Sequence, residues 1–213
     1  MRGSANAYSI AERSPLSGDV AFFLRGALAA PVRTGAVLPS SRWLARAATG
    51  VLAEFTEPDV VELGPGAGSG TRIIQRRLAG AGRHVAVELN PAFAHRLAGR
   101  YPDVDVVCDT AAALPEILEA RQMTTVDAVI SGLPFTVMPT EVQDEIIDGV
   151  ARTLHPERGV FTTFTYLGAF STQKARRFRA LLLERFDELV VSRPVLRNIP
   201  PAYVLTARRP RLV

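Results

Sequence analysis

The sequence is poor in cysteine, in lysine and in long apolar runs. Its 213 residues include one cysteine, Cys108, and three histidines whose spacing is not that of metal ligands. A single cysteine excludes an internal disulfide and a multi-cysteine metal site, and we expect no bound metal. The apolar runs, such as 20–24 and 181–183, fall far short of the ~20 residues that span a bilayer.

A secretion signal is also absent from the start of the sequence. Asp19 and Arg25 interrupt the only apolar run there, and an export signal needs a continuous one. We therefore expect a cytoplasmic protein. Among 25 basic residues only Lys174 is not arginine, and the formal net charge is +4. This charge suits either nucleic acid or an anionic membrane and does not choose between them.

The composition is that of a folded chain, with 47% hydrophobic and 22% charged residues, because disordered chains have fewer apolar residues. The length fits one domain. We expect a flexible terminus over 1–14 and a single domain over 15–213. Within that domain, 15–55 form an N-terminal helical cap and 56–210 form the core.

The cap contains two expected helices. Apolar residues recur every three or four positions from Val20 to Leu28, which predicts an amphipathic helix over 18–30. Ser40 or Ser41 can cap a second helix that runs to about residue 55.

The core alternates strands with helices. We expect strands at 59–63, 83–88, 104–108, 126–131, 159–165, 189–195 and 202–207, and helices at 69–78, 91–100, 111–120, 140–154 and 171–185. Such alternation predicts a parallel sheet covered on both faces. The last two strands have no helix between them, which favours an antiparallel pair. The expected fold is therefore α/β and Rossmann-like, with a seven-stranded, mostly parallel sheet.

A glycine-rich turn follows the first core strand. Residues 60–70 read VVELGPGAGSG. Glycines let the chain turn tightly and let a ligand lie against the backbone. The spacing of Gly64, Gly66 and Gly68 differs from the G-x-G-x-x-G of dinucleotide sites. Glu62 stands just before them, where a carboxylate would lie beside the ammonium group of a bound amino acid.

This turn resembles the first motif of class I S-adenosylmethionine-dependent methyltransferases, E-x-G-x-G-x-G. Glu88 ends the second strand, where that class places an acid that binds the ribose hydroxyls. Asp109 follows the third strand, where the class places an acid near the adenine. Ligands of open α/β sheets bind at these carboxyl ends of strands. The resemblance implies S-adenosylmethionine as cofactor, S-adenosylhomocysteine as product and no metal.

The loop after the fourth strand, SGLPF at 131–135, is the expected reaction end of the site. In amino-methylating members of the class this loop lies beside the sulfonium and the acceptor nitrogen. It resembles the tetrad of adenine methyltransferases but lacks their first Asn or Asp. We predict that Ser131, Gly132 and Leu133 contact the cofactor and that Pro134 and Phe135 contact the substrate.

Two further stretches, TGAVLPSSR at 34–42 and RNIPPAYV at 197–204, resemble segments of bacterial phospholipid N-methyltransferases. With the preceding motifs, this resemblance covers residues 20–207. It implies stepwise methylation of phosphatidylethanolamine, through the mono- and dimethyl lipids, to phosphatidylcholine. It also implies that Arg197, Asn198 and Tyr203 bind substrate.

The implied reaction needs a neutral amine, and an alkylammonium group with a pKa near ~10 must first lose a proton. The candidates for this step are Tyr166, Tyr203 and, less favoured, His155. Ser131 completes the predicted catalytic set. Either tyrosine could instead be a core aromatic with its hydroxyl at the surface.

A lipid enzyme without a membrane span must dock on the bilayer. The 18–30 helix carries Phe22, Phe23 and Arg25 and could lie in the interface, reversibly, on the inner face of the cytoplasmic membrane. It could equally pack on the core. The basic stretch 174–185 is either a recruiter of anionic lipids or a solvated helix face.

Three other functions stay open: an RNA adenine dimethylase, a small-molecule amine or oxygen methyltransferase, and a cofactor-binding sensor. Against the first stand the missing Asn before Leu133 and the scarcity of aromatic residues in the basic stretch, because RNA-binding surfaces stack bases on aromatic rings. We therefore expect no nucleic-acid partner.

Overall fold

The computed structural model describes residues 41–211. The predicted 18–30 helix, with Phe22, Phe23 and Arg25, lies outside the described residues. The second cap helix is in two pieces, α2 (Arg42–Ala48) and the 3₁₀ helix η1 (Gly50–Glu54). Ser41 caps α2 by accepting a hydrogen bond from the Leu44 amide. The expected continuous helix breaks at Thr49, whose hydroxyl donates to the Ala45 carbonyl at 2.7 Å, a backbone contact that competes with regular helix geometry.

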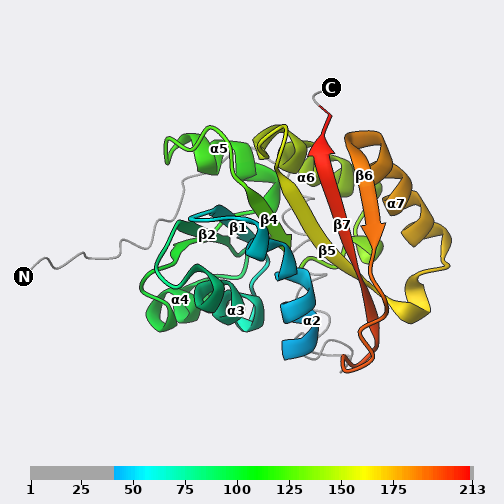
Figure 1. Ribbon diagram of the computed structural model, residues 1–213, viewed down its shortest axis with the longest axis horizontal. Coiled ribbons are helices and arrows are strands. Elements are labelled where there is room, and N and C mark those ends of the chain that lie inside the picture. The colour runs from blue at the N-terminus through cyan, green and yellow to red at the C-terminus, as the bar shows by residue number, and fades with distance from the viewer. Residues whose placement is uncertain (1–40, 212–213) are drawn as a thin grey trace, which may run out of the picture.

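Seven strands form one mixed sheet in the order β3-β2-β1-β4-β5-β7-β6, which confirms the predicted fold class (Figure 1). The strands are β1 (Asp59–Leu63), β2 (Arg83–Val87), β3 (Asp105–Val107), β4 (Ala128–Ser131), β5 (Val160–Tyr166), β6 (Phe186–Val191) and β7 (Ala202–Pro210). The first five pair in parallel, and β7 runs antiparallel to both β5 and β6.

The sixth strand was predicted three residues too late. It begins at Phe186, directly after α7 (Gln173–Arg185), and ends at Val191 rather than at residue 195. The Phe186 side chain is fully buried and stacks on Phe161, which fixes the start of the strand. Pro194 has no amide to give to a ladder, and residues 192–201 form the connection to β7.

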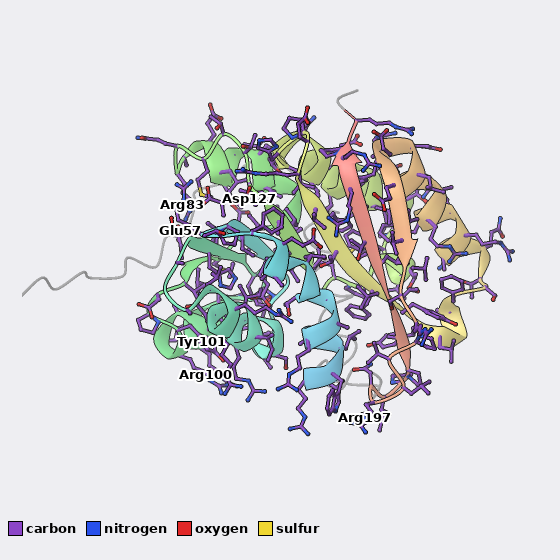
Figure 2. The ribbon with its side chains drawn as sticks, in the orientation of Figure 1. Glu57, Arg83, Arg100, Tyr101, Asp127 and Arg197 are labelled. Carbon is purple, nitrogen blue, oxygen red and sulfur yellow. The ribbon has the colours of Figure 1, made fainter. Side chains whose placement is uncertain are left out.

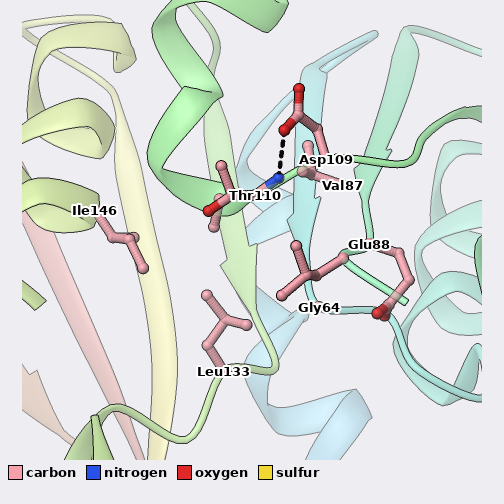
Figure 3. Close-up of a pocket in the computed structure, with 9 residues that line it drawn as sticks. Gly64, Val87, Glu88, Asp109, Thr110, Leu133 and Ile146 are labelled. Atoms are coloured by element: carbon pink, nitrogen blue, oxygen red, sulfur yellow. Dashed lines mark hydrogen bonds between the residues drawn. The ribbon is translucent and has the colours of Figure 1, made fainter. Parts of the chain in front are cut away.

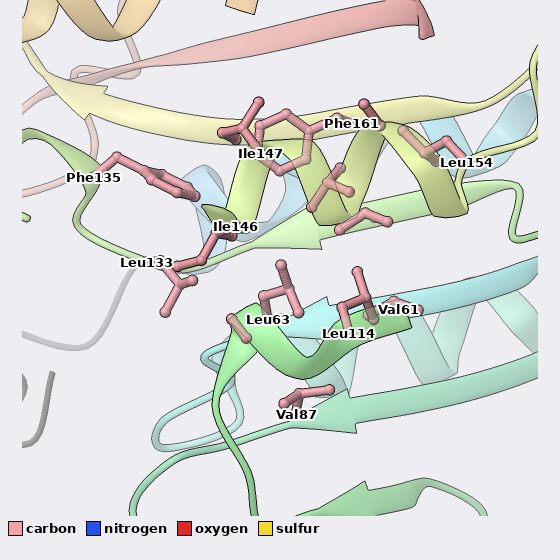
Figure 4. Close-up of a cluster of buried hydrophobic side chains, with 14 of the residues drawn as sticks. Val61, Leu63, Val87, Leu114, Leu133, Phe135, Ile146, Ile147, Leu154 and Phe161 are labelled. Atoms are coloured by element: carbon pink, nitrogen blue, oxygen red, sulfur yellow. The ribbon is translucent and has the colours of Figure 1, made fainter. Parts of the chain in front are cut away.

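Helices cover both faces of the sheet. One face packs against α2 and α3 (Ser69–Leu78), with α4 (Pro91–Arg100) beside β2 and β3. The other packs against α5 (Leu114–Glu119), α6 (Thr140–Thr153) and α7, and Figure 4 shows that core. The predicted 111–120 helix is split into the 3₁₀ turn η2 (Ala111–Ala113) and α5, because Pro115 has no amide to continue a helix from η2.

The parallel strands end at one edge of the sheet, and the loops that follow them converge there. The Gly64 amide, at the end of β1, donates to the Val87 carbonyl of β2 at 2.9 Å, and the Gly132 amide, after β4, donates to the Leu63 carbonyl at 2.8 Å. Within residues 41–211 no helix is both long and apolar enough to cross a membrane.

Candidate active site

The glycine turn after β1 has the backbone conformation that its sequence predicts. Gly64, Gly66 and Gly68 have φ angles of +66°, +53° and +81°, and other L-residues adopt this region at a cost of about 1–2 kcal/mol each. A Cβ atom on Gly66 would meet no atom within 4 Å. The backbone of this residue therefore faces open space, where a ligand can lie against it.

Glu88 connects this turn to the end of β2. Its carboxylate accepts hydrogen bonds from the Gly66 amide at 2.9 Å and from the Asn90 amide at 2.8 Å. Burial raises the pKa of the Glu88 carboxyl above its ordinary value, although these backbone amides oppose the shift. A carboxylate has about four lone-pair positions, and those that remain can accept from the hydroxyls of a ligand.

Glu88 and Asp109 line the same pocket, as Figure 3 shows. The pocket is bounded by Gly64, Val87, Glu88, Leu89, Asp109, Thr110, Ala111, Leu133 and Ile146. The Asp109 carboxylate accepts from the Thr110 amide at 2.7 Å. The pocket has two acids and apolar walls, and the open backbone of Gly66 lies two residues from Gly64 on the same turn. These residues suit a nucleoside with an aminoacyl chain and so fit S-adenosylmethionine. Gly64, Glu88, Asp109 and Leu133 are the predicted residues that the structure brings together here.

Glu62 points away from this pocket, to the α3 side of the sheet. Its carboxylate accepts from the Thr71 hydroxyl at 2.6 Å and lies 3.5 Å from His84 Nε2. The Gln75 amide nitrogen lies 3.0 Å from His84 Nδ1, so Gln75 of α3 holds the imidazole beside Glu62. The contact between Glu62 and an ammonium group stays a prediction.

The residues that hold Glu62 were not predicted from the sequence. A Cβ atom on Gly70 would lie 2.3 Å from Glu62 Oε1, so glycine is needed there for the carboxylate to fit. Gly70 is the fourth glycine of the VVELGPGAGSG pattern, so the sequence could have indicated its role. No sequence pattern indicates the roles of Thr71 and His84, because their contacts with Glu62 join α3, β1 and β2.

The 131–135 loop packs directly on the glycine turn. A Cβ atom on Gly132 would lie 2.7 Å from the Gly64 carbonyl oxygen, and one on Gly64 would lie 2.6 Å from Leu133 Cδ2. Ser131 is buried, and its hydroxyl accepts from the Leu133 amide at 3.2 Å. Ser131 therefore shapes the loop in this structure, and its catalytic role stays a prediction.

Phe135 was predicted to contact substrate, but its ring lies in the core. It is 1% exposed, stacks on Phe178 with the ring centroids 4.6 Å apart, and meets Phe161 edge-on at 6.1 Å. The Gln143 side-chain amide of α6 donates to the Phe135 carbonyl at 2.9 Å and so ties the 131–135 loop to α6. The structure thus gives Phe135 a packing role, whereas Pro134 is partly exposed.

The two tyrosines proposed for proton removal lie on opposite faces of the sheet. Tyr203 of β7 pairs with Thr165, and Tyr166 pairs with Ala202, and side chains alternate between faces along a strand. Tyr203 packs on Phe170 at 4.6 Å, whereas Tyr166 meets Phe164 on the α2 side. Burial raises the pKa of the Tyr166 hydroxyl, which keeps it protonated at neutral pH.

Two predicted substrate residues, Asn198 and Arg197, and the less favoured base candidate His155 are not among the residues that line the pocket. Asn198 is buried, and its side chain accepts from the Ser41 amide at 2.9 Å and donates to the Pro200 carbonyl at 2.6 Å. Asn198 thus ties the connection between β6 and β7 to the start of α2, and its contact with substrate stays a prediction. Arg197 is exposed, with its guanidinium 4.6 Å from the centroid of the Trp43 ring. His155 accepts from backbone amides in an exposed turn.

Comparison with known proteins agrees with this geometry. Residues 60–157 match the model of a methyltransferase domain family. The fold is shared with a precorrin-6y C5,15-methyltransferase from Geobacter metallireducens, with a TM-score of 0.56 and 20% identity over 78% of this chain and 87% of the other. It is also shared with Aeropyrum pernix fibrillarin containing bound S-adenosyl-L-methionine, with a TM-score of 0.57 and 14% identity over 78% and 76%.

The fold and the pocket define a class I S-adenosylmethionine-dependent methyltransferase, and S-adenosylmethionine is its cofactor. The chain is 34% identical over 168 residues to the ornithine lipid N-methyltransferase of Singulisphaera acidiphila, which covers 77% of this chain and 82% of that protein. It therefore belongs to the bacterial family of S-adenosylmethionine-dependent lipid N-methyltransferases.

Proposed function

We propose that the chain methylates the head-group amine of phosphatidylethanolamine and of its mono- and dimethyl derivatives, toward phosphatidylcholine. The observation that carries the proposal is the 34% identity to a lipid N-methyltransferase over most of both chains. That relative is named for ornithine lipid, and ornithine lipid and phosphatidylethanolamine share an aliphatic amine on a lipid. The phosphatidylethanolamine assignment rests on the 34–42 and 197–204 stretches described above.

The residues support methyl transfer by position. S-adenosylmethionine, when bound, supplies an electrophilic methyl group. Glu88 and Asp109 would hold the nucleoside end, and the close contact between Gly132 and the Gly64 carbonyl would set the sulfonium end beside the 131–135 loop. An amine placed at this loop is aligned for in-line attack, and alignment is the main contribution that the chain makes.

The amine must be neutral when it attacks. Tyr203 is the better candidate to assist, because it lies on the same face of the sheet as Leu133 and Ile146 of the pocket. Burial among apolar side chains also favours the uncharged amine. Tyr166 lies on the opposite face of the sheet, beside Phe164, and burial raises the pKa of its hydroxyl further above neutral pH.

The test is a methyl-transfer assay with labelled S-adenosylmethionine. Vesicles of phosphatidylethanolamine, of its mono- and dimethyl derivatives and of ornithine lipid are offered separately, and total RNA and a soluble amine serve as parallel acceptors. We expect label in the phosphatidylethanolamine series. Label confined to ornithine lipid would retain lipid N-methylation and reject the finer assignment. Label only in RNA or in the soluble amine would reject both.

A further inference from the structure

Three guanidinium groups surround one tryptophan at the start of α2. The Cζ atoms of Arg42, Arg46 and Arg197 lie 5.0, 5.5 and 4.6 Å from the centroid of the Trp43 ring. Within residues 41–211, none of these arginines takes part in an ion pair. An aromatic ring therefore holds the cations together, and no acid in the described part of the chain neutralises their positive charge.

Two apolar side chains stand exposed beside this cluster. Leu196 is 69% exposed and Ile199 is 73% exposed, the highest values among the large hydrophobic residues that the structure describes. They flank Arg197 in the connection between β6 and β7. Asn198, buried between them, accepts from the Ser41 amide at 2.9 Å and ties this connection to the start of α2. The apolar and cationic side chains thus belong to one surface.

This surface lies at the edge of the sheet that carries the pocket. Ala202, which follows the connection, pairs with Tyr166 at the carboxyl end of β5. Figure 2 shows Arg197 at the lower end of the molecule, well below Arg83 and Asp127, which lie at the amino ends of β2 and β4.

We propose that Trp43, Arg42, Arg46, Arg197, Leu196 and Ile199, here called the Trp43 surface, dock the protein on an anionic lipid bilayer. Leu196 and Ile199 enter the interface between head groups and acyl chains, and the arginines contact lipid phosphates. Tryptophan is suited to the head-group level because its ring is apolar and its N–H is polar. The proposal deepens the proposed function, since docking here brings lipid head groups to the edge where the pocket opens.

A bilayer fits this surface better than the α7 helix, the other basic region. On α7, Arg177 pairs with Asp144 and Arg185 pairs with Asp148. Arg179 lies 4.0 Å from the Phe170 ring centroid and donates to the Phe170 carbonyl. Arg177 and Arg185 are thus paired with acids, whereas the arginines at Trp43 are not paired with any acid in the described residues. Because α7 also lacks the protruding apolar pair, the contacts do not favour recruitment by the 174–185 stretch.

The chain has one tryptophan, and its fluorescence therefore reports docking directly. Full-length protein is titrated with phosphatidylcholine vesicles that contain about 40% phosphatidylglycerol, and with pure phosphatidylcholine vesicles. We expect a blue shift of Trp43 emission, and quenching by lipids brominated near the head group, only with the anionic vesicles. Each arginine near an anionic membrane surface contributes about 1 kcal/mol to binding. The R42Q/R46Q/R197Q variant should therefore partition onto the anionic vesicles about 100-fold more weakly than the wild type.

Two further variants separate charge from insertion. L196S/I199S should weaken partitioning about tenfold or more. The matched control R152Q/R209Q/R211Q removes the same charge near the ends of α6 and β7, at the opposite edge of the sheet, and should change partitioning less than about threefold. Unchanged S-adenosylmethionine binding by each variant shows that it is folded.

Equal partitioning of wild type and R42Q/R46Q/R197Q would overturn the proposal, as would an equal loss in the control. A blue shift that follows protein concentration without vesicles would assign the surface to a second copy of the chain and overturn it too. The methyl-transfer assay is read separately on the wild type. Vesicle docking without label in any lipid would reject the proposed function and retain the Trp43 surface. Label in lipid without docking at Trp43 would retain the proposed function and reject the Trp43 surface.

Discussion

At the scale of single residues, the structure separates acids that face the ligand pocket from acids that support it. Glu88 and Asp109 line the pocket, whereas Glu62 is held beneath the glycine turn by Thr71 and His84. Glu62 is the last residue but one of β1, and Glu88 and Asp109 follow β2 and β3. The direction of each side chain decides its role, because neighbouring positions on a strand face opposite sides of the sheet.

Glu88→Gln should weaken S-adenosylmethionine binding about 10- to 100-fold, since a hydrogen bond to a charged group contributes about 1.5–3 kcal/mol. Isothermal titration calorimetry of the wild type, of this variant and of the matched control Glu119→Gln, at an exposed position of α5, measures the effect. Equal affinities for all three proteins would contradict a role for Glu88 in the pocket.

The raised pKa of Glu88 adds a pH dependence with a definite sign. Its carboxyl becomes protonated at a higher pH than that of an ordinary glutamate. As the pH is lowered, cofactor affinity should therefore begin to fall before the pH reaches the range in which an ordinary glutamate titrates. The free protein responds oppositely, because a raised pKa contributes stability that is present at low pH and lost as the pH rises through that pKa. Isothermal titration calorimetry from pH 8 to pH 5 should show that the S-adenosylmethionine affinity of Glu88→Gln depends less on pH than that of the wild type.

Gly132 lies where the 131–135 loop packs on the glycine turn. In Gly132→Ala, the new methyl would lie 2.7 Å from the Gly64 carbonyl oxygen, and this overpacking should cost about 1–3 kcal/mol and reduce cofactor affinity at least tenfold. Gly99→Ala on α4, where a Cβ meets nothing within 4 Å, is the control and should be neutral or stabilising by up to about 1 kcal/mol. Urea unfolding compares the two, and equal stabilities would contradict this interpretation.

At the scale of elements, the alternation of side chains along β5 and β7 makes the two candidate tyrosines inequivalent. We expect Tyr203→Phe to lower kcat on the lipid acceptor about tenfold or more, within the range of acid–base effects. Tyr166→Phe, on the α2 face, should change kcat less than about twofold. Steady-state kinetics with vesicles tests the pair. A larger loss for Tyr166→Phe would place the acceptor on the other face.

The reaction loop is also supported by an element distant in sequence, because α7 supplies the ring on which Phe135 stacks. Phe178→Ala should lower the free energy of unfolding by about 3–5 kcal/mol. Because the 131–135 loop would lose its anchor, cofactor affinity should fall as well. Chemical denaturation with and without S-adenosylmethionine measures both. Lower stability with unchanged affinity would show that the loop keeps its shape without this stacking.

At the scale of the whole molecule, the pocket and the Trp43 surface share one edge of the sheet. The parallel strands bring the glycine turn and the 131–135 loop there, and the antiparallel β7 begins there. A protein docked through Leu196 and Ile199 would therefore keep its pocket close to the lipid head groups. Substrate capture and catalysis would then use one face of the molecule.

The sequence by itself determined the strand and helix order, the left-handed glycines and the acids that end β2 and follow β3. These are local properties: hydrophobic period, glycine conformation and position at a strand end. It did not determine the break after α2 or the start of β6, because a side-chain hydrogen bond and the burial of Phe186 decide these boundaries.

Only the tertiary structure decided which predicted site residues meet. Phe135 and Asn198 belong to the 131–135 and 197–204 motifs in the sequence, yet one stacks in the core and the other ties the β6–β7 connection to Ser41. The Arg197 guanidinium contacts the Trp43 ring although 154 positions separate Trp43 from Arg197 in the sequence. Such contacts depend on packing between distant elements, and no period or spacing within one segment encodes them.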